Sequence, residues 1–231
     1  MYKLHIGNKN YSSWSLRPWV LMKELGIPFE EIFHQFPPDR PSYPEFKEFS
    51  PSGLVPVLED GDFKVWESLG IVEYLAEHHD GVWPDDPKAR AWARSATAEM
   101  HGGFSALRNI CGMNCGVRAK LHEVSPALHR DLARLEELWA DGLLHFGGPF
   151  LAGETFTAVD AFFCPVAFRI QTYNPPMGEK AKAYAFRLLT LDPMLDWYKA
   201  ALREDFREPN HEAETKASGE WTADYRAAVK A

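Results

Sequence analysis

The chain has 231 residues, of which 45% are hydrophobic and 25% are charged, a composition that excludes disorder along its whole length. Its formal net charge of −8 makes nucleic acid and anionic membranes poor partners by default. The longest apolar run, residues 161–168, is far shorter than the roughly 20 residues of a membrane-spanning helix. Because the first ten residues also lack the apolar core of a signal peptide, we expect a cytoplasmic protein.

The first 79 residues are predicted to alternate strands with helices. The expected strands are Tyr2–Ile6, Phe29–Phe36, Val55–Glu59 and Phe63–Trp66, and the expected helices are Trp14–Leu25, Pro44–Phe49 and Glu67–His79. Asp60, Gly61 and Asp62 separate the last two strands, and an Asp-Gly pair in that place predicts a hairpin. A strand-helix-strand unit followed by a hairpin and a helix predicts a four-stranded mixed sheet with helices on its faces.

The strand patterns end at residues 80–87. This stretch is rich in Asp, Gly and Pro, a composition that predicts a linker. Helices are then predicted at Lys88–Cys111, Ser125–Phe146, Thr157–Tyr173 and Pro193–Arg203. Asp192 is the expected N-cap of the last of these, and Thr157 with Asp160 fits a capping box. Residues 88–231 are therefore expected to form an all-helical domain, with a polar and partly loose tail from Glu208 onward.

The chain contains three cysteines, Cys111, Cys115 and Cys164. An odd number without a secretion signal predicts free thiols in a reducing compartment. Cys111 and Cys115 are spaced to share a helix face, but a structural zinc site needs four ligands. We therefore expect buried thiols and no metal site.

Three serines, Ser12, Ser13 and Ser15, lie where the first predicted strand leads into the first predicted helix. The start of a helix stabilises an anion such as a thiolate or a carboxylate, and a hydroxyl there can donate a hydrogen bond to that anion. Serine is also favoured at this place simply because it caps helices, so the pattern alone leaves both interpretations open.

Two further patterns concern ligand binding. A cis Val55-Pro56 bond would turn the N–H and C=O groups of Val55 outward to pair with an extended peptide, although a trans proline at a sheet edge is commoner. Ser68 is the expected N-cap of the next helix, where N–H groups hold a carboxylate, and Glu67 is a suitable acceptor for an ammonium group. Glutathione carries a thiol, a peptide backbone and an amino-acid end, and so satisfies all three patterns.

The order and spacing of four segments resemble the cytosolic glutathione S-transferases over roughly residues 1–205. These segments are SSWSLRPW at 12–19, VPVLEDG at 55–61, ESLGIVEYLAE at 67–77 and GETFTAVDAFFCPV at 153–166. The chain is most similar to bacterial, zeta-like, serine-type members. The resemblance implies a thioredoxin-like glutathione-binding domain at residues 1–79, the linker at 80–87 and an all-α domain at 88–231. It also implies a homodimer that uses glutathione as a co-substrate, with no tightly bound cofactor.

The resemblance further assigns roles to residues. In some classes the catalytic residue lies five positions before the arginine of the first helix, which is Ser12 before Arg17; in theta-like members the interval is four, which is Ser13. We favour Ser12 and retain Ser13. Glutathione is then expected to contact Val55, Pro56, Glu67 and Ser68. The pocket for the second substrate is expected to be lined by Tyr11, Trp14, Met100, Phe104 and Arg108, although Met100 and Phe104 also fit a core position.

The expected activity is conjugation of the glutathione thiolate to a small electrophile. One alternative is a zeta-like isomerase of the maleylacetoacetate type. Trp14 stands where the zeta motif has a cysteine, and Thr172 where it has an arginine, with Arg169 one turn earlier, so the isomerase is the weaker hypothesis. A second alternative is a non-catalytic glutathione-binding protein. Thiol–disulfide exchange is disfavoured because the first domain contains no cysteine.

Overall fold

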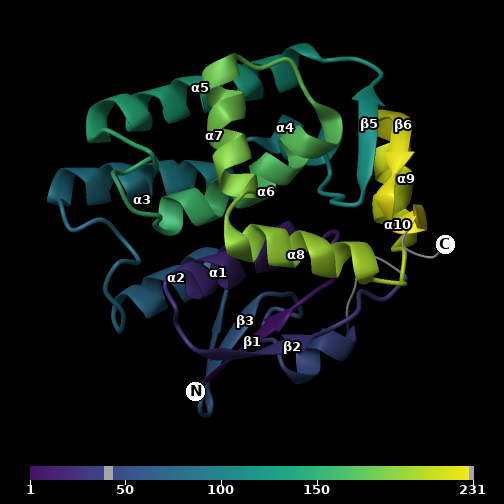
Figure 1. Ribbon diagram of the computed structural model, residues 1–231. Coiled ribbons are helices and arrows are strands. Elements are labelled where there is room, and N and C mark those ends of the chain that lie inside the picture. Colours follow the sequence, from purple (N-terminus) through teal and green to yellow (C-terminus); the bar gives the residue numbers. More distant parts are fainter. Residues whose placement is uncertain (39–43, 229–231) are drawn as a thin grey trace.

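The computed structural model describes residues 1–38 and 44–228 (Figure 1). Its first part contains β1 (Tyr2–Ile6), α1 (Ser13–Glu24), β2 (Phe29–Phe33), the 3₁₀ helix η1 (Pro44–Glu48), β3 (Val57–Asp60), β4 (Phe63–Trp66) and α2 (Ser68–Ala76). Its second part contains α3 (Pro87–Gly102), α4 (Ser105–Ile110), β5 (Val117–Leu121), α5 (Pro126–Phe146), α6 (Ala158–Tyr173), α7 (Glu179–Leu189), α8 (Asp192–Arg203), α9 (Pro209–Ser218), β6 (Gly219–Asp224) and α10 (Tyr225–Ala228).

The first part forms the expected four-stranded mixed sheet, in the order β2-β1-β3-β4. β1 runs parallel to β2 and antiparallel to β3, and the β3–β4 hairpin turns at Gly61, whose φ of 63° suits a residue without a side chain. Leu4, Ile6 and Leu58 are fully buried in the core. The predicted fold class, a thioredoxin-like domain followed by a helical domain, is confirmed.

Helix α1 lies between the sheet and the helical domain, in contact with both β1 and α6 (Figure 1). Its residues from Ser15 to Met22 are all buried, so this helix has no solvent-exposed stripe along most of its length. Helix α6 is buried almost throughout as well. Burial of apolar side chains on both faces therefore fixes the start of α1 at the junction of the two parts of the chain.

The predicted single helix over Lys88–Cys111 is wrong, because the chain breaks between α3 and α4. Phe104 adopts a left-handed conformation with φ 53°, which an α-helix cannot continue through. The Asp131 carboxylate accepts a hydrogen bond from the Leu107 N–H at 2.9 Å and so stabilises the start of the second helix.

Two predicted helix caps are also corrected. Leu191, rather than Asp192, is the N-cap residue of α8, and Asp192 is the first helical residue. Glu67 takes the N-cap position of α2 that was expected for Ser68.

The tail from Glu208 onward is folded rather than partly loose in the described residues up to 228. Strands β5 and β6 pair antiparallel and form a ribbon that the sequence analysis missed within the expected all-α domain. This ribbon, α9 and α10 lie along one side of the molecule, beside the end of α8 (Figure 1). The C-terminal segment therefore reaches the region where the two parts of the chain meet.

All three cysteines are buried and unpaired, as expected. Burial raises the pKa of the Cys111 thiol to about 12, so this thiol stays protonated at neutral pH.

Among the residues that the structure describes, no helix is both long and apolar enough to cross a bilayer.

The predicted capping box at the start of α6 is confirmed. The Asp160 carboxylate is fully buried and accepts hydrogen bonds from the Thr157 and Leu151 N–H groups, both at 3.0 Å, and from the Tyr184 hydroxyl at 2.7 Å. One side chain thus ties the start of α6 to the preceding loop and to α7.

We predict that Asp160→Ala lowers the free energy of unfolding by roughly 3 kcal/mol or more, because it leaves buried donors without an acceptor. Chemical denaturation followed by circular dichroism measures this loss. Asp141→Ala is a matched control, since the Asp141 carboxylate accepts from the Trp92 indole N–H at the surface and its removal should cost about 1 kcal/mol or less. Equal losses in the two variants would contradict the role given to Asp160.

Candidate active site

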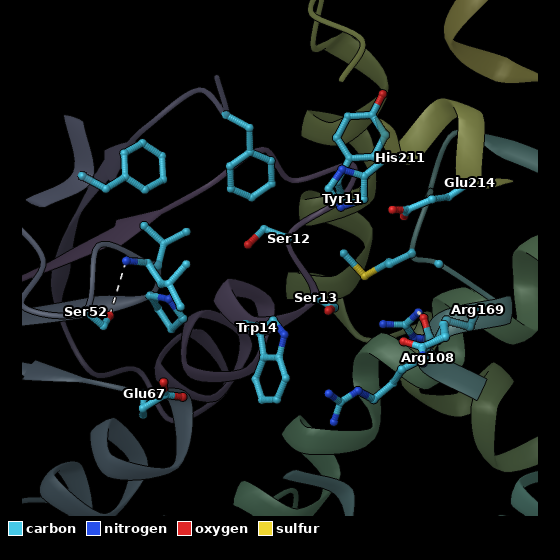
Figure 2. Close-up of a pocket in the computed structure, with 18 residues that line it drawn as sticks. Tyr11, Ser12, Ser13, Trp14, Ser52, Glu67, Arg108, Arg169, His211 and Glu214 are labelled. Atoms are coloured by element: carbon cyan, nitrogen blue, oxygen red, sulfur yellow. Dashed lines mark hydrogen bonds between the residues drawn. The ribbon is translucent and has the colours of Figure 1, made fainter. Parts of the chain in front are cut away.

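A cavity of about 740 Å³ lies between the start of α1 and the helical domain. From the first part of the chain it is lined by Tyr11, Ser12, Ser13, Trp14, Phe36, Phe46, Ser52, Leu54, Val55, Pro56 and Glu67. From the second part it is lined by Arg108, Asn109, Gly112, Met113, Arg169, His211 and Glu214. Figure 2 shows Ser52 and Glu67 on one side of the cavity and Arg108, Arg169 and Glu214 on the other. The cavity thus has one wall from each part of the chain.

Ser12 and Ser13 both line this cavity at the first residues of α1. Ser12 is the N-cap residue, and its hydroxyl donates to the Ser15 hydroxyl at 2.7 Å instead of capping the helix backbone. The Ser15 hydroxyl also accepts from the Gly7 N–H at 3.2 Å. Ser13 is partly exposed, and its hydroxyl has no hydrogen-bond partner among the described residues. The simple capping interpretation of Ser12 is therefore wrong in this structure.

The peptide bond between Val55 and Pro56 is cis, the one of the two conformations that turns the Val55 peptide groups outward. Val55 lies just before β3, outside the ladder that pairs β3 with β1. The neighbouring Leu54 N–H is satisfied by the Ser50 hydroxyl at 3.1 Å, but within residues 1–38 and 44–228 neither the N–H nor the C=O of Val55 has a hydrogen-bond partner. A partly buried peptide group of this kind needs a ligand or water to complete its hydrogen bonds.

Glu67 and Ser68, adjacent in sequence, are placed differently. Glu67 lines the cavity from the N-cap position of α2, and its φ of 65° turns the chain sharply from β4 into this helix. Ser68 is fully buried behind the cavity wall, where its hydroxyl accepts from Arg17 Nη1 at 3.4 Å. The Glu67 side chain is therefore brought to the cavity, whereas the Ser68 side chain is not part of the lining.

Tyr11 contributes its ring to the lining, but its hydroxyl is engaged elsewhere. The hydroxyl donates to Glu212 Oε1 and accepts from Arg226 Nη1, both at 2.6 Å. Burial, followed by the hydrogen bond to Glu212, raises the pKa of Tyr11. Figure 2 shows this hydroxyl pointing away from Ser12, towards the C-terminal segment. Tyr11 therefore anchors α9 and α10 over the cavity.

Of the residues expected in the pocket for the second substrate, Trp14 and Arg108 line the cavity, and Met100 and Phe104 do not. Met100 is 1% exposed and Phe104 7%, and both belong to the hydrophobic core, which is the alternative position that their sequence pattern also fitted. The sequence analysis missed several lining residues, namely Phe36, Phe46, Ser52, Leu54, Asn109, Gly112, Met113, His211 and Glu214. Those from the C-terminal segment carry no local signal, because a polar helix at the end of a chain does not indicate what it packs against.

Comparisons with known proteins agree with this architecture. The model of the glutathione S-transferase N-terminal domain matches residues 11–78, and that of the glutathione S-transferase C-terminal domain matches residues 119–227, so the two together span most of the chain. The chain belongs to the glutathione S-transferase family. The expected family and the expected order of its two domains are thus confirmed.

Individual relatives share moderate sequence identity with this member of the family. Glutathione S-transferase 1 of Dianthus caryophyllus is 25% identical over 218 residues, which cover 86% of this chain and 97% of the relative. Dichloromethane dehalogenase of Methylophilus leisingeri is 47% identical over 60 residues, but the match covers only 26% of this chain and 22% of the dehalogenase.

A similar solved structure is the theta class glutathione S-transferase from Xanthomonas axonopodis pv. citri, which contains bound glutathione. It has a TM-score of 0.62 and 22% identity, and the match covers 85% of this chain and 96% of that one. At this identity the likeness establishes the fold alone.

We predict that Tyr11→Phe weakens the fold without changing the ionisation of a thiol bound in the cavity. Removing the hydroxyl leaves Glu212 and Arg226 without a shared partner, which should cost about 1–3 kcal/mol of the free energy of unfolding. Denaturant titration measures the loss, and the pH profile of kcat/KM should stay that of the wild type. A shifted profile would show that the Tyr11 hydroxyl reaches the reacting sulfur.

Proposed function

We propose that this chain is a glutathione transferase that holds the thiolate of glutathione at the start of α1 and conjugates it to a small electrophile. The observation that carries the proposal is the Val55 peptide group, which lacks a partner in the described chain and shares one cavity with the hydroxyls of Ser12 and Ser13. The Val55 N–H and C=O would pair with the cysteinyl residue of glutathione, as an added strand pairs with a sheet edge. The cis Pro56 ring would pack beside it.

The other wall residues of the first part fit the glutamyl end of glutathione. The Glu67 carboxylate is an acceptor for the ammonium group, and the N–H groups at the first turn of α2 suit the carboxylate. We assign this carboxylate to the backbone N–H of Ser68, because the Ser68 hydroxyl is fully buried behind the cavity wall. The hydroxyl accepts a hydrogen bond from Arg17 there and supports the start of α2 from behind.

Activation of the thiol needs no general base in this scheme. A free thiol titrates near 8.5, and lowering its pKa by about two units requires roughly 2.7 kcal/mol. A helix N-terminus supplies about 0.3–1 kcal/mol, and a hydrogen bond to a charged sulfur supplies about 1.5–3 kcal/mol. Together these terms are sufficient. The thiol proton then passes to solvent, the sulfur bonds to the electrophilic carbon, and the leaving group departs with its electron pair.

We favour Ser12 as the hydroxyl donor to the sulfur, with Ser15 as a positioning residue. The Ser15 hydroxyl accepts from the Gly7 N–H, so it can turn its own proton towards Ser12 Oγ. That exchange frees the Ser12 proton for the thiolate while the pair stays hydrogen-bonded. Ser13 is the alternative donor, because its hydroxyl lines the cavity without a partner among the described residues.

We predict that Ser12→Ala raises the pKa of bound glutathione by about one to two units, because one charge-assisted hydrogen bond is lost. The rate at neutral pH should then fall roughly ten- to a hundredfold and recover at alkaline pH, where the thiolate forms without help. The measurements are the thiolate absorbance of the binary complex and the pH profile of kcat/KM with a chromogenic electrophile.

Ser13→Ala is the matched control for this prediction, since it removes a hydroxyl from the adjacent helical position. Ser15→Ala should give a smaller pKa shift than Ser12→Ala, as expected for a residue that acts through Ser12. If only Ser13→Ala moves the profile, the donor is Ser13. If neither substitution moves it, serine-type activation is wrong.

We predict that Glu67→Gln raises the KM for glutathione while kcat at saturation stays nearly unchanged, and that Ser68→Ala, which removes a buried support of the same helix start, raises the KM less. The glutamyl end is bound equally in the ground state and the transition state, so its loss weakens binding alone. Steady-state kinetics with varied glutathione separate the two constants. Lower kcat at an unchanged KM would place these residues in the chemical step.

A fluorescence titration with glutathione, combined with a conjugation assay, distinguishes the proposed enzyme from a non-catalytic glutathione-binding protein. Binding without turnover of any electrophile would favour the non-catalytic protein.

The maleylacetoacetate-type isomerase is less well supported. Thr172 stands where the zeta motif has an arginine; its hydroxyl donates to the Asn114 carbonyl at 2.8 Å, and the residue lies outside the cavity lining. The homodimer and the cytoplasmic location remain predictions from the sequence.

A further inference from the structure

We propose that the wall of the cavity formed by the helical domain binds an anionic group, a carboxylate, carried by the second substrate. The inference deepens the proposed function, on which it rests, by naming the class of electrophile that the site accepts. It follows from two arginines, Arg108 and Arg169, that line this end of the cavity, together with Arg17, which is buried next to Trp14 of the lining.

The hydrogen bonds of the three guanidinium groups go to neutral acceptors. Arg169 Nη1 donates to the carbonyls of Arg108 and Cys111. Arg108 Nη1 donates to the carbonyls of His101 and Gly103 at 3.0 and 3.3 Å. Arg17 Nη1 donates to the Ser68 hydroxyl at 3.4 Å. Carbonyl and hydroxyl oxygens accept the protons but do not neutralise the three positive charges.

No carboxylate forms an ion pair with any of these arginines in the described ranges 1–38 and 44–228, although nine other arginine and lysine side chains there do pair with Asp or Glu. An unpaired buried charge is costly, and it is normally matched by a counter-charge or a bound ligand. An anionic ligand in the cavity would supply the missing negative charge.

Of the three arginines, Arg169 has the features of an anion-binding side chain most directly. Its side chain lines the cavity although it is only 6% exposed, and its Nε is buried without any hydrogen-bond partner among the described residues. Burial is the main cause that lowers its pKa to about 10, so the group is still protonated at neutral pH. Arg169 thus combines a protonated guanidinium, a place in the cavity lining and no carboxylate partner in the described residues, and a guanidinium is a planar donor suited to a carboxylate.

The neighbours of Arg169 reinforce the positive potential. Arg17 is 2% exposed; burial lowers its pKa, and the charges of Arg169 and Arg108 lower it further, whereas the Glu67 carboxylate raises it. Arg17 and Arg108 each lie against the Trp14 ring, at 4.1 and 5.0 Å from its centroid, which holds their planar groups beside the cavity. This cluster exists in a chain whose net charge is −8.

The position of the arginines separates this anion from the glutamyl end of glutathione. Figure 2 shows Glu67 across the cavity from Arg169, with Trp14 between them, and Glu214 on the same side as Arg169 but beyond it. Ser13, at the start of α1, faces the region between the two walls. A carboxylate held by Arg108 and Arg169 would therefore lie on the far side of the sulfur from the glutamyl group.

The test compares two probes that differ only in the group attached to the sulfur, S-propylglutathione and S-(2-carboxyethyl)glutathione. We expect the wild type to bind the carboxyethyl probe about tenfold more tightly, the effect of one hydrogen bond to a charged group. Arg108→Met and Arg169→Met should each remove most of this preference and leave the Kd of S-propylglutathione nearly unchanged. Isothermal titration calorimetry at neutral pH measures each Kd.

Arg134→Met is the matched control, because it removes an arginine of the helical domain that pairs with Glu99 and Glu137 at the surface. It should retain the full preference, and Arg108→Lys should retain part of it. Circular dichroism checks that Arg169→Met folds, and the less buried Arg108 provides the test if it does not.

Three results would overturn the inference. Equal binding of the two probes by the wild type would show that the wall does not select a carboxylate. Equal weakening of both probes by Arg108→Met would assign the arginines to a carboxylate of glutathione itself, since S-propylglutathione retains both. If neither probe binds, the proposed glutathione site fails and the inference fails with it, whereas the first two results leave the proposed function standing.

Discussion

Burial of α1 on two sides is the constraint on which the rest of the structure depends. The sheet covers one face of the helix and α6 covers the other, so the helix cannot shift without opening both cores. Its polar N-terminal residues, Ser12 and Ser13, are thereby held at the edge of both layers. A helix start fixed in this way keeps its dipole and its hydroxyls directed at one place in the cavity.

The two walls of the cavity differ in chemistry because they come from different kinds of structure. The wall from the first part offers a peptide group at Val55, hydroxyls and the Glu67 carboxylate, which together suit a small peptide. The wall from the helical part offers guanidinium groups at Arg108 and Arg169, with Met113 beside them. In the proposed function, glutathione would therefore be matched by backbone geometry and the second substrate by charge, with the start of α1 between them.

The C-terminal segment completes the cavity through buried polar contacts. Arg226 is 2% exposed and donates to the Tyr11 hydroxyl and to the carbonyls of Glu204 and Phe206. Glu212 accepts from the same hydroxyl and pairs with Arg207 at 3.0 Å. Because these charged groups satisfy one another, the segment can be buried at moderate cost, and it brings His211 and Glu214 to the cavity.

The sequence by itself determined the four-stranded mixed sheet, the hairpin at Gly61 and the capping box at Asp160, because local periodicity and turn chemistry specify those features. The order and spacing of four segments indicated the family. The sequence also indicated Ser12, Val55 and Glu67 as ligand-binding residues. Only the tertiary structure decided that Met100 and Phe104 belong to the core, that β5 pairs with β6, and that Arg108 and Arg169 share a cavity wall where, in the described residues, neither forms an ion pair. Those features join residues far apart in the chain, and their charges and hydrogen bonds are balanced only by neighbours that folding brings together.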